Sequence, residues 1–418
     1  MRFLQFLLVV CVFFLASCSA TRKKNIVKQP VAITAPDTVK VIPVPEPIKE
    51  KASDTLVIGL LLPLQLEPHF TNDTLPDTNP LIMEDALPAL HFYEGALSAV
   101  DSFANPKFKI RLKVIDCSGD SQQVSKIIAG KQLTGCQAII AMAGSNLNGS
   151  LASAAQRLNV PVILLQSANR QFLEVNKNIW LAGPSNSTQL KEMAAFLYEN
   201  FPASNFIAIY REQRKENELA AFFAAEIDSL AGKAGTCFSM NYKTGSWPTL
   251  QAKLTKQKRN ILIIPTSDES YLSTLLLKLD ESQKDYSFLL CGLPSWDKFE
   301  SVNPVVLSEL NTHIFNGLFI DQSNIRVMNF RKAFIDEYHA DPMLQAYQAF
   351  DLVTYIAVNY AKYQKEYSKY LSLPNLEFPE MGYKYVPVCE SCGLENKRVT
   401  VLKFGDYELK RVVSHEKE

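Results

Sequence analysis

Short apolar runs alternate with amphipathic segments from Leu56 to Leu290. The run Leu56–Pro63 is continuous and ends in proline, as expected of a strand buried on both faces of a parallel sheet. The segment Phe92–Asp101 has the spacing of an amphipathic helix. Further strands are predicted at 110–115, 138–142, 162–165, 206–210, 236–242, 261–264 and 287–290. Further helices are predicted at 124–128, 151–158, 190–198, 219–230, 250–254 and 271–279. This alternation predicts an α/β protein with helices on both faces of its sheets.

The alternation pauses at Gly183–Pro184 and then resumes, which divides the chain into two similar halves. Each half is expected to form a Rossmann-like lobe, a parallel sheet flanked by helices. Ligands of such sheets bind beyond the carboxyl ends of the strands, at the point where the strand order reverses. A cleft between two such edges is therefore the expected ligand site.

Five sequence blocks in a fixed order resemble the type I periplasmic binding proteins, typified by the leucine/isoleucine/valine-binding proteins. They resemble the opening strand, the first helix, the fourth strand with its ligand loop, the first crossing between lobes and the late helix that returns to lobe 1. The blocks are Ile58–Leu64, Phe92–Asp101, Asn159–Asn169, Leu181–Ser185 and Ala346–Asp351. The resemblance covers about Leu56–Tyr363 and extends to outer-membrane lipoproteins of this fold that activate penicillin-binding proteins. It implies hinge crossovers between the lobes.

The resemblance also implies domain boundaries. Lobe 1 is expected to comprise 55–182 and about 322–363, and lobe 2 to comprise 183–321 and about 364–418. The C-terminal stretches 382–388, 399–404 and 407–413 alternate as strands do, and we assign them to lobe 2.

In the amino-acid-binding members of the family, small polar residues after the third and fourth strands hold the ligand carboxylate. The equivalent loops here contain Ser145 and Asn146, and Ser167, Ala168 and Asn169. Backbone N–H groups at helix N-termini next to such residues suit an anion.

An acidic residue of the second lobe usually faces the ligand ammonium. Asp268 or Glu269 is in the corresponding place, and Tyr210 is a candidate for lining the cleft. The alternative is that all the predicted ligand residues are loop or helix caps, because Ser, Asn and Asp commonly begin helices. Two departures argue against a simple amino-acid specificity: Ala141–Gly144 replaces the usual Gly-Pro, and the loop Gln65–Leu90 is long and polar.

The N-terminus resembles a bacterial lipoprotein signal. Arg2 precedes the apolar run Phe3–Phe14, which is shorter than the roughly 20 residues of a membrane span. Leu15–Cys18 resembles a lipobox, which implies that residues 1–17 are removed and that Cys18 is acylated (palmitate and related chains). An ordinary cleaved signal is the alternative. Residues 18–54 are rich in proline and read as a flexible tether. Serine after the lipidated cysteine resembles the pattern of outer-membrane lipoproteins that face the periplasm.

The pair Cys389 and Cys392 lies at an expected hairpin turn. A turn-closing disulfide is the first expectation, because export to an oxidising compartment permits it. Two free thiols are the alternative, and a zinc site lacks a second pair of ligands at suitable spacing.

The sequence offers no catalytic signature. Its five histidines are scattered, and it has neither a Gly-x-Ser-x-Gly elbow nor a glycine-rich phosphate loop. The 43 basic and 43 acidic residues balance, and the basic excess of the tether leaves the body mildly acidic, which argues against nucleic acid as a partner.

We therefore expect a non-enzymatic protein without cofactor or metal. Its expected partners are a small amino-acid-like or peptide-like ligand, the membrane through the N-terminal lipid, and a transporter permease or a peptidoglycan synthase. The two hypotheses for function are an ABC-type amino acid transport component and a scaffold that regulates peptidoglycan synthesis.

Overall fold

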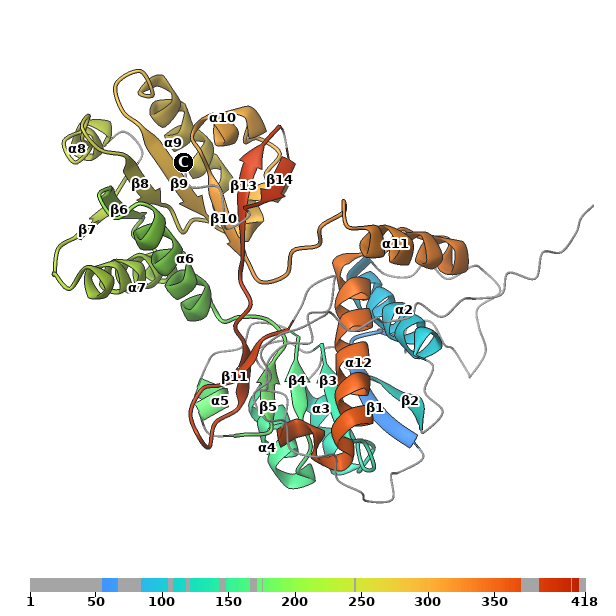
Figure 1. Ribbon diagram of the computed structural model, residues 1–418. Coiled ribbons are helices and arrows are strands. Elements are labelled where there is room, and N and C mark those ends of the chain that lie inside the picture. The colour runs from blue at the N-terminus through green and yellow to red at the C-terminus, as the bar shows by residue number, and fades with distance from the viewer. Residues whose placement is uncertain are drawn as a thin grey trace, which may run out of the picture. The chain divides into compact units, whose positions relative to one another are not determined.

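The computed structural model describes residues 55–66, 84–103, 108–117, 121–142, 148–165, 171–174, 176–243, 246–369, 383–406 and 408–412. These residues form two separate seven-stranded sheets, each with helices on both faces (Figure 1). The expected signal peptide, the lipid-attachment residue Cys18 and the tether to residue 54 lie outside the described residues.

The first sheet has the strand order β11-β12-β5-β4-β3-β1-β2. Its strands are β1 (Thr55–Leu62), β2 (Lys109–Asp116), β3 (Ala138–Ala141), β4 (Val162–Leu164), β5 (Ile179–Leu181), β11 (Tyr385–Pro387) and β12 (Leu394–Asn396). All pairs are parallel except β11 with β12.

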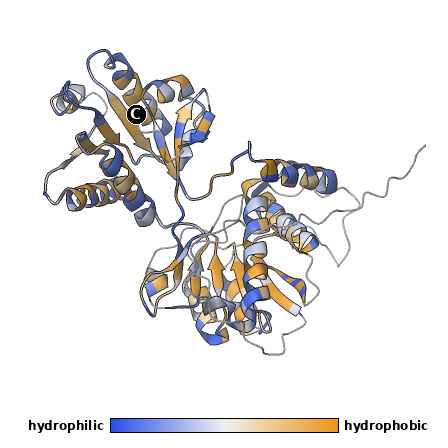
Figure 2. Ribbon diagram, viewed as in Figure 1, coloured by the Kyte–Doolittle hydropathy of each residue, from blue (hydrophilic) through white to orange (hydrophobic). Residues whose placement is uncertain are grey.

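Helices cover this sheet on both faces. They are η2 (Glu84–Ala86), α2 (Leu87–Ser102), α3 (Ser121–Ala129), α4 (Asn148–Leu158), α5 (Gln171–Glu174), α12 (Leu344–Tyr363) and η5 (Gln364–Lys369). On β1, Ile58 and Leu60 pack in the core under α2 and α12, whereas Leu61 packs in the core under α3 and α4. The continuous apolar run of β1 is thus explained by burial on both faces, and Figure 2 shows the strands of both sheets as largely hydrophobic.

The second sheet repeats this plan in the order β14-β13-β10-β9-β8-β6-β7. Its strands are β6 (Asn205–Tyr210), β7 (Cys237–Asn241), β8 (Asn260–Ile263), β9 (Phe288–Gly292), β10 (His313–Asn316), β13 (Thr400–Gly405) and β14 (Glu408–Arg411). Its helices are α6 (Asn186–Asn200), α7 (Arg214–Ala231), α8 (Trp247–Gln251), α9 (Glu269–Glu281), η4 (Pro294–Lys298) and α10 (Pro304–Glu309). Strands β13 and β14 are antiparallel, so both sheets are mixed but mostly parallel. The predicted class, α/β with two Rossmann-like lobes, is confirmed.

The chain passes between the two sheets three times, after β5, after β10 and after β12. After the second passage, α11 (Ile325–Tyr338) packs on the first lobe, where Phe334 stacks on His91 of α2 and the Tyr338 hydroxyl donates to the Glu94 carbonyl. Helix α11 therefore packs with the helices of the first sheet.

The C-terminal part differs from the expected boundary. Strands β11 and β12, within the segment assigned to lobe 2, belong to the first sheet, where β12 pairs with β5. Only β13 and β14 complete lobe 2. The alternation of side chains identifies a strand but not the sheet edge with which it pairs, and here the open edge of β5 accepts it.

The three passages touch one another. Glu395 of β12 is fully buried, and its Oε1 accepts from the backbone N–H of Ser185 (2.8 Å) and from its hydroxyl (2.6 Å). The amide of Asn396 donates to the carbonyl of Ala182 at 2.9 Å. A Cβ on Gly317, in the second passage, would lie 2.2 Å from the ring of Pro184 in the first. Backbone and side-chain contacts therefore fix the passages against each other.

Helices α2 and α12 make a close backbone contact. A Cβ built on Gly95 of α2 would lie 2.1 Å from the carbonyl oxygen of Ala346 in α12. Helix α2 begins at Leu87, with Pro88 in its first turn, so the end of the expected loop Gln65–Leu90 is helical. The middle of that loop, 67–83, lies outside the described residues.

A disulfide joins Cys389 to Cys392 at the turn between β11 and β12. In the part of the chain that the structure describes, no helix is both long enough and apolar enough to cross a membrane.

Candidate functional site

The predicted ligand residues of lobe 1 lie outside the described residues. They are Ser145, Asn146, Ser167, Ala168 and Asn169. The strands before them, β3 and β4, end at Ala141 and Leu164.

The predicted residues of lobe 2 follow the carboxyl ends of β6 and β8. Tyr210 is the last residue of β6 and is half-buried. Asp268 is the N-cap of α9, where its Oδ1 accepts from the backbone N–H of Tyr271 at 2.9 Å. Glu269 turns to a different partner, the hydroxyl and backbone N–H of Ser301. The structure thus separates the two acidic candidates and leaves Asp268, whose side chain is 41% exposed, at this edge.

An arginine that the sequence reasoning missed organises the edge. Arg211 follows β6 directly, and its Nη1 donates to Asp268 Oδ2 at 2.6 Å. Its Nε and Nη2 donate to Glu216, with Nη2 and Oε1 at 2.5 Å. Glu216, in the first turn of α7, is only 5% exposed. The signal in the sequence is a basic residue immediately after a buried strand, followed by a glutamate in the next helix.

Hydrogen bonds through Thr266 fix the loop between β8 and α9. The Thr266 hydroxyl donates to Glu216 Oε1 at 2.9 Å, and the backbone N–H of Asp268 donates to Thr266 Oγ1 at 3.1 Å. The indole N–H of Trp296 donates to the Thr266 carbonyl at 2.9 Å. The ring of Trp296 fits there because residue 292 is glycine. A Cβ at this position would lie 2.3 Å from the ring. The carboxylate of Asp268 is therefore held by a rigid frame.

Charge at this edge is unevenly balanced. One guanidinium faces two carboxylates, so Arg211, Glu216 and Asp268 together carry a net charge of about −1. Burial disfavours the charged form of Glu216, but hydrogen bonds from Arg211 and Thr266 outweigh it, so its pKa lies below the usual range. The backbone N–H of Tyr271 and the Arg211 guanidinium lower the pKa of Asp268. Both carboxylates are thus ionised at neutral pH. No group of metal-ligating side chains occurs among the described residues.

These shifts predict a pH-dependent effect of Arg211→Gln. A carboxyl with a lowered pKa in the folded state stabilises the protein above its unfolded-state pKa, and this contribution is lost as the pH falls through the folded-state pKa. In the variant, Glu216 stays buried without its cation, so its pKa should rise. The cost at pH 7 should be about 2 kcal/mol, below that of a fully buried pair because the guanidinium side is 18% exposed.

Thermal unfolding midpoints measured between pH 7 and pH 3 test this. The difference between wild type and Arg211→Gln should be largest near neutrality and should narrow below about pH 4.5. A difference that stays constant with pH would contradict the assigned ion pairs.

Comparison with solved structures identifies the fold. The ABC transporter substrate-binding protein from Desulfitobacterium hafniense, in complex with Leu, has a TM-score of 0.56 and 16% identity, over 86% of this chain and 100% of that one. A putative branched-chain amino acid ABC transporter protein from Rhodospirillum rubrum has a TM-score of 0.65 and 13% identity, over 86% and 100%. The C-domain of LpoA from Haemophilus influenzae, a regulator of PBP1A, has a TM-score of 0.55 and 14% identity, over 85% and 100%.

The chain therefore has the two-lobed fold of the type I periplasmic binding proteins. At these identities the likeness establishes the fold alone, and this fold serves both amino acid transport proteins and a regulator. No family model matches the sequence, and no curated protein matches it.

Proposed function

We propose that this chain is a non-enzymatic, lipid-anchored ligand-binding protein of the bacterial cell envelope, held at Cys18 in the outer membrane and facing the periplasm. Its two lobes would close on a small polar, amino-acid-like ligand, as the binding component of an ABC-type transporter. The anchor is proposed from the sequence, and the ligand class from the carboxyl edge of lobe 2.

The proposed class of ligand is supported mainly by the Asp268 carboxylate. It is part-exposed, ionised and oriented by Arg211 and by the N-terminus of α9. Because Arg211, Glu216 and Asp268 together carry a net charge of about −1, the exposed carboxylate favours a cationic group such as a ligand ammonium. When the lobes close, the ligand would gain contacts from both of them. It shifts the equilibrium between the open and closed states only to the extent that it binds the closed state more tightly. The ligand carboxylate would be held from lobe 1 by Ser145, Asn146 and Ser167–Asn169, and Tyr210 would line the site.

A binding experiment with Asp268→Asn tests this. Asparagine caps a helix about as well as aspartate, so the variant should fold with little loss of stability. A hydrogen bond to a charged group contributes about 1.5–3 kcal/mol, so affinity for the ligand should fall about 10- to 100-fold. The ligand is first sought by thermal shift with the free amino acids and with muropeptides, and the affinities are then measured by calorimetry.

Asp336→Asn, on the exposed face of α11, is the matched control and should leave binding unchanged. The proposal fails if no compound in the panel raises the unfolding midpoint, or if Asp268→Asn binds as tightly as Asp336→Asn.

The second candidate is a scaffold that regulates peptidoglycan synthesis. What favours it is the likeness to the LpoA C-domain, described as a regulator of PBP1A, over that domain's whole length. Affinity capture from envelope extracts separates the candidates: recovery of a transporter permease supports ligand delivery, and recovery of a peptidoglycan synthase supports the scaffold.

A further inference from the structure

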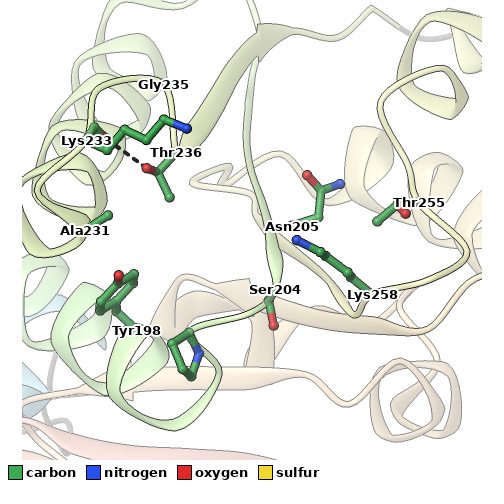
Figure 3. Close-up of a pocket in the computed structure, with 10 residues that line it drawn as sticks. Tyr198, Ser204, Asn205, Ala231, Lys233, Gly235, Thr236, Thr255 and Lys258 are labelled. Carbon is green, nitrogen blue, oxygen red and sulfur yellow. Dashed lines mark hydrogen bonds between the residues drawn. The ribbon is translucent and has the colours of Figure 1, made fainter.

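Lobe 2 has a pocket at the edge of its sheet opposite to Arg211 and Asp268. The pocket, of about 530 Å³, lies where β6, β7 and β8 begin. It is lined in part by Tyr198, Ser204, Lys233 and Lys258 (Figure 3). The amino and carboxyl ends of parallel strands lie at opposite edges of a sheet, so this pocket is separate from the candidate ligand site.

Two lysines supply the charge of the pocket. Lys233 follows Gly232, the C-cap of α7, and Lys258 precedes β8. Figure 3 shows their side chains extending into the open space from different sides. Both are exposed, and neither forms an ion pair with a carboxylate of the described chain. The residues that line the pocket include no aspartate or glutamate.

Hydrogen-bond donors remain available beside the lysines. The hydroxyls of Thr236 and Thr255 donate to the Lys233 carbonyl and to Gln257 Oε1, so their hydrogens are already used. The hydroxyls of Tyr198 and Ser204 form no hydrogen bond with the described chain. Two ammonium groups and two hydroxyls therefore line one space.

Negative charge near the pocket is largely compensated. The Asp228 carboxylate accepts the backbone N–H groups of Gly235, Thr236 and Cys237 at 2.8–3.0 Å, which directs it into the turn after α7. The C-terminus of α7 contributes about half a negative elementary charge, which two ammonium groups exceed.

Further basic residues strengthen the positive potential. The segment between α8 and β8 contains Lys253, Lys256, Lys258 and Arg259 and no acidic residue. Lys256 pairs with Asp285, whereas the Lys253 ammonium lies over the ring of Phe238, 4.2 Å from its centre. In a chain with equal numbers of basic and acidic residues, this concentration is local.

We propose that the pocket binds a phosphomonoester, with Lys233 and Lys258 neutralising its two charges and the hydroxyls of Tyr198 and Ser204 donating to its remaining oxygens. Lysine binds phosphate as a point charge and does not need the planar geometry of a guanidinium. The volume exceeds that of a phosphate group alone, so the pocket has room for a substituent such as glycerol or a sugar. A soluble phosphate ester and a phosphomonoester lipid headgroup share this chemistry.

The test uses the full-length protein at low ionic strength, with Cys18→Ser in every protein compared so that no lipid at this position contributes to vesicle binding. Calorimetry with glycerol 3-phosphate addresses the soluble source, and co-sedimentation with phosphatidylcholine vesicles with and without phosphatidic acid addresses the lipid headgroup. In at least one arm, wild type should bind saturably. The double variant Lys233→Gln/Lys258→Gln should lose at least about 10-fold in affinity, because two charge contacts are removed. The arm that responds identifies the source.

The control is Lys191→Gln/Lys215→Gln, which removes two exposed lysines of α6 and α7 that do not line the pocket. It should bind as wild type does, and added NaCl should weaken binding by wild type. The proposal is overturned if neither arm saturates by about 10 mM phosphate groups (roughly ten-thousandfold weaker than binding at 1 μM), or if the two double variants lose affinity equally. Equal unfolding midpoints of the three proteins exclude misfolding as the cause.

Discussion

Replacing Gly95 with alanine should destabilise the protein by about 3 kcal/mol or more, although it adds only one methyl group. The new Cβ would lie 2.1 Å from the carbonyl oxygen of Ala346, and both groups belong to helix backbones. No rotamer change relieves such a clash, so α12 must shift away from α2. Because α12 contributes Leu352, Val353 and Ile356 to the core of lobe 1, the shift also loosens that core. The thermal unfolding midpoint measures the effect.

Gly149→Ala is the matched control, because Gly149 also lies in a helix but no atom of the described residues lies within 4 Å of the place of its Cβ. Alanine is favoured over glycine in a helix by about 1 kcal/mol, so this variant should be neutral or slightly stabilised. If both variants unfold at the same temperature, the close approach of α2 and α12 is wrong.

Replacing Glu395 with leucine should cost about 2–5 kcal/mol, because the backbone N–H of Ser185 would then be buried without an acceptor and the Ser185 hydroxyl would keep only the hydroxyl oxygens of Ser187 and Thr188. Leucine is close in volume to glutamate, so little of the loss would come from a cavity. The loss should appear as a lower midpoint of thermal or urea unfolding. The Ser185 hydroxyl also accepts from the backbone N–H of Thr188, so the start of α6 should become less protected in hydrogen exchange.

Glu395→Gln separates the hydrogen bonds from the charge. Its amide oxygen can replace Oε1 as the acceptor, but its NH2 group would take the place of Oε2, which is buried without a hydrogen-bond partner, so this variant should lose about 1–3 kcal/mol and less than the leucine variant. A glutamine variant as unstable as the leucine variant would show that the negative charge, and not the acceptor, is what the site requires.

Much of the fold could be predicted from the sequence, because a parallel strand that is buried on both faces has a continuous run of apolar residues. The runs at Leu56–Pro63 and 261–264 became β1 and β8 with shifts of one residue. Two of the three-residue strands, β5 and β12, are not among the predicted strands, whereas β4, of the same length, is. The helix expected at 250–254 is instead α8, Trp247–Gln251, where Pro248 lies in the first turn.

Partner choice was harder to predict than element type. The alternation near residue 385 predicts a strand but does not predict the sheet to which the strand belongs. Strand pairing depends on which sheet edge is open in the folded protein. The same limit applies to the candidate site. Asp268 is predicted from its position after a strand, whereas the pairing of Arg211 with both Asp268 and Glu216 joins residues up to 57 positions apart. Contacts of that range leave no local pattern.

The discontinuous lobes have a consequence for how the protein is made. A ribosome releases the N-terminal half of the first sheet early, yet α12, β11 and β12 lie beyond residue 343. Until these elements have been synthesised, lobe 1 is incomplete: β5 is exposed as an edge, and the face of the sheet under α12 is covered only by α2. Lobe 2 lacks only β13 and β14 over the same interval. The lobe that begins first is thus completed with the last quarter of the chain, and a nascent chain stalled before α12 would be a natural substrate for a chaperone.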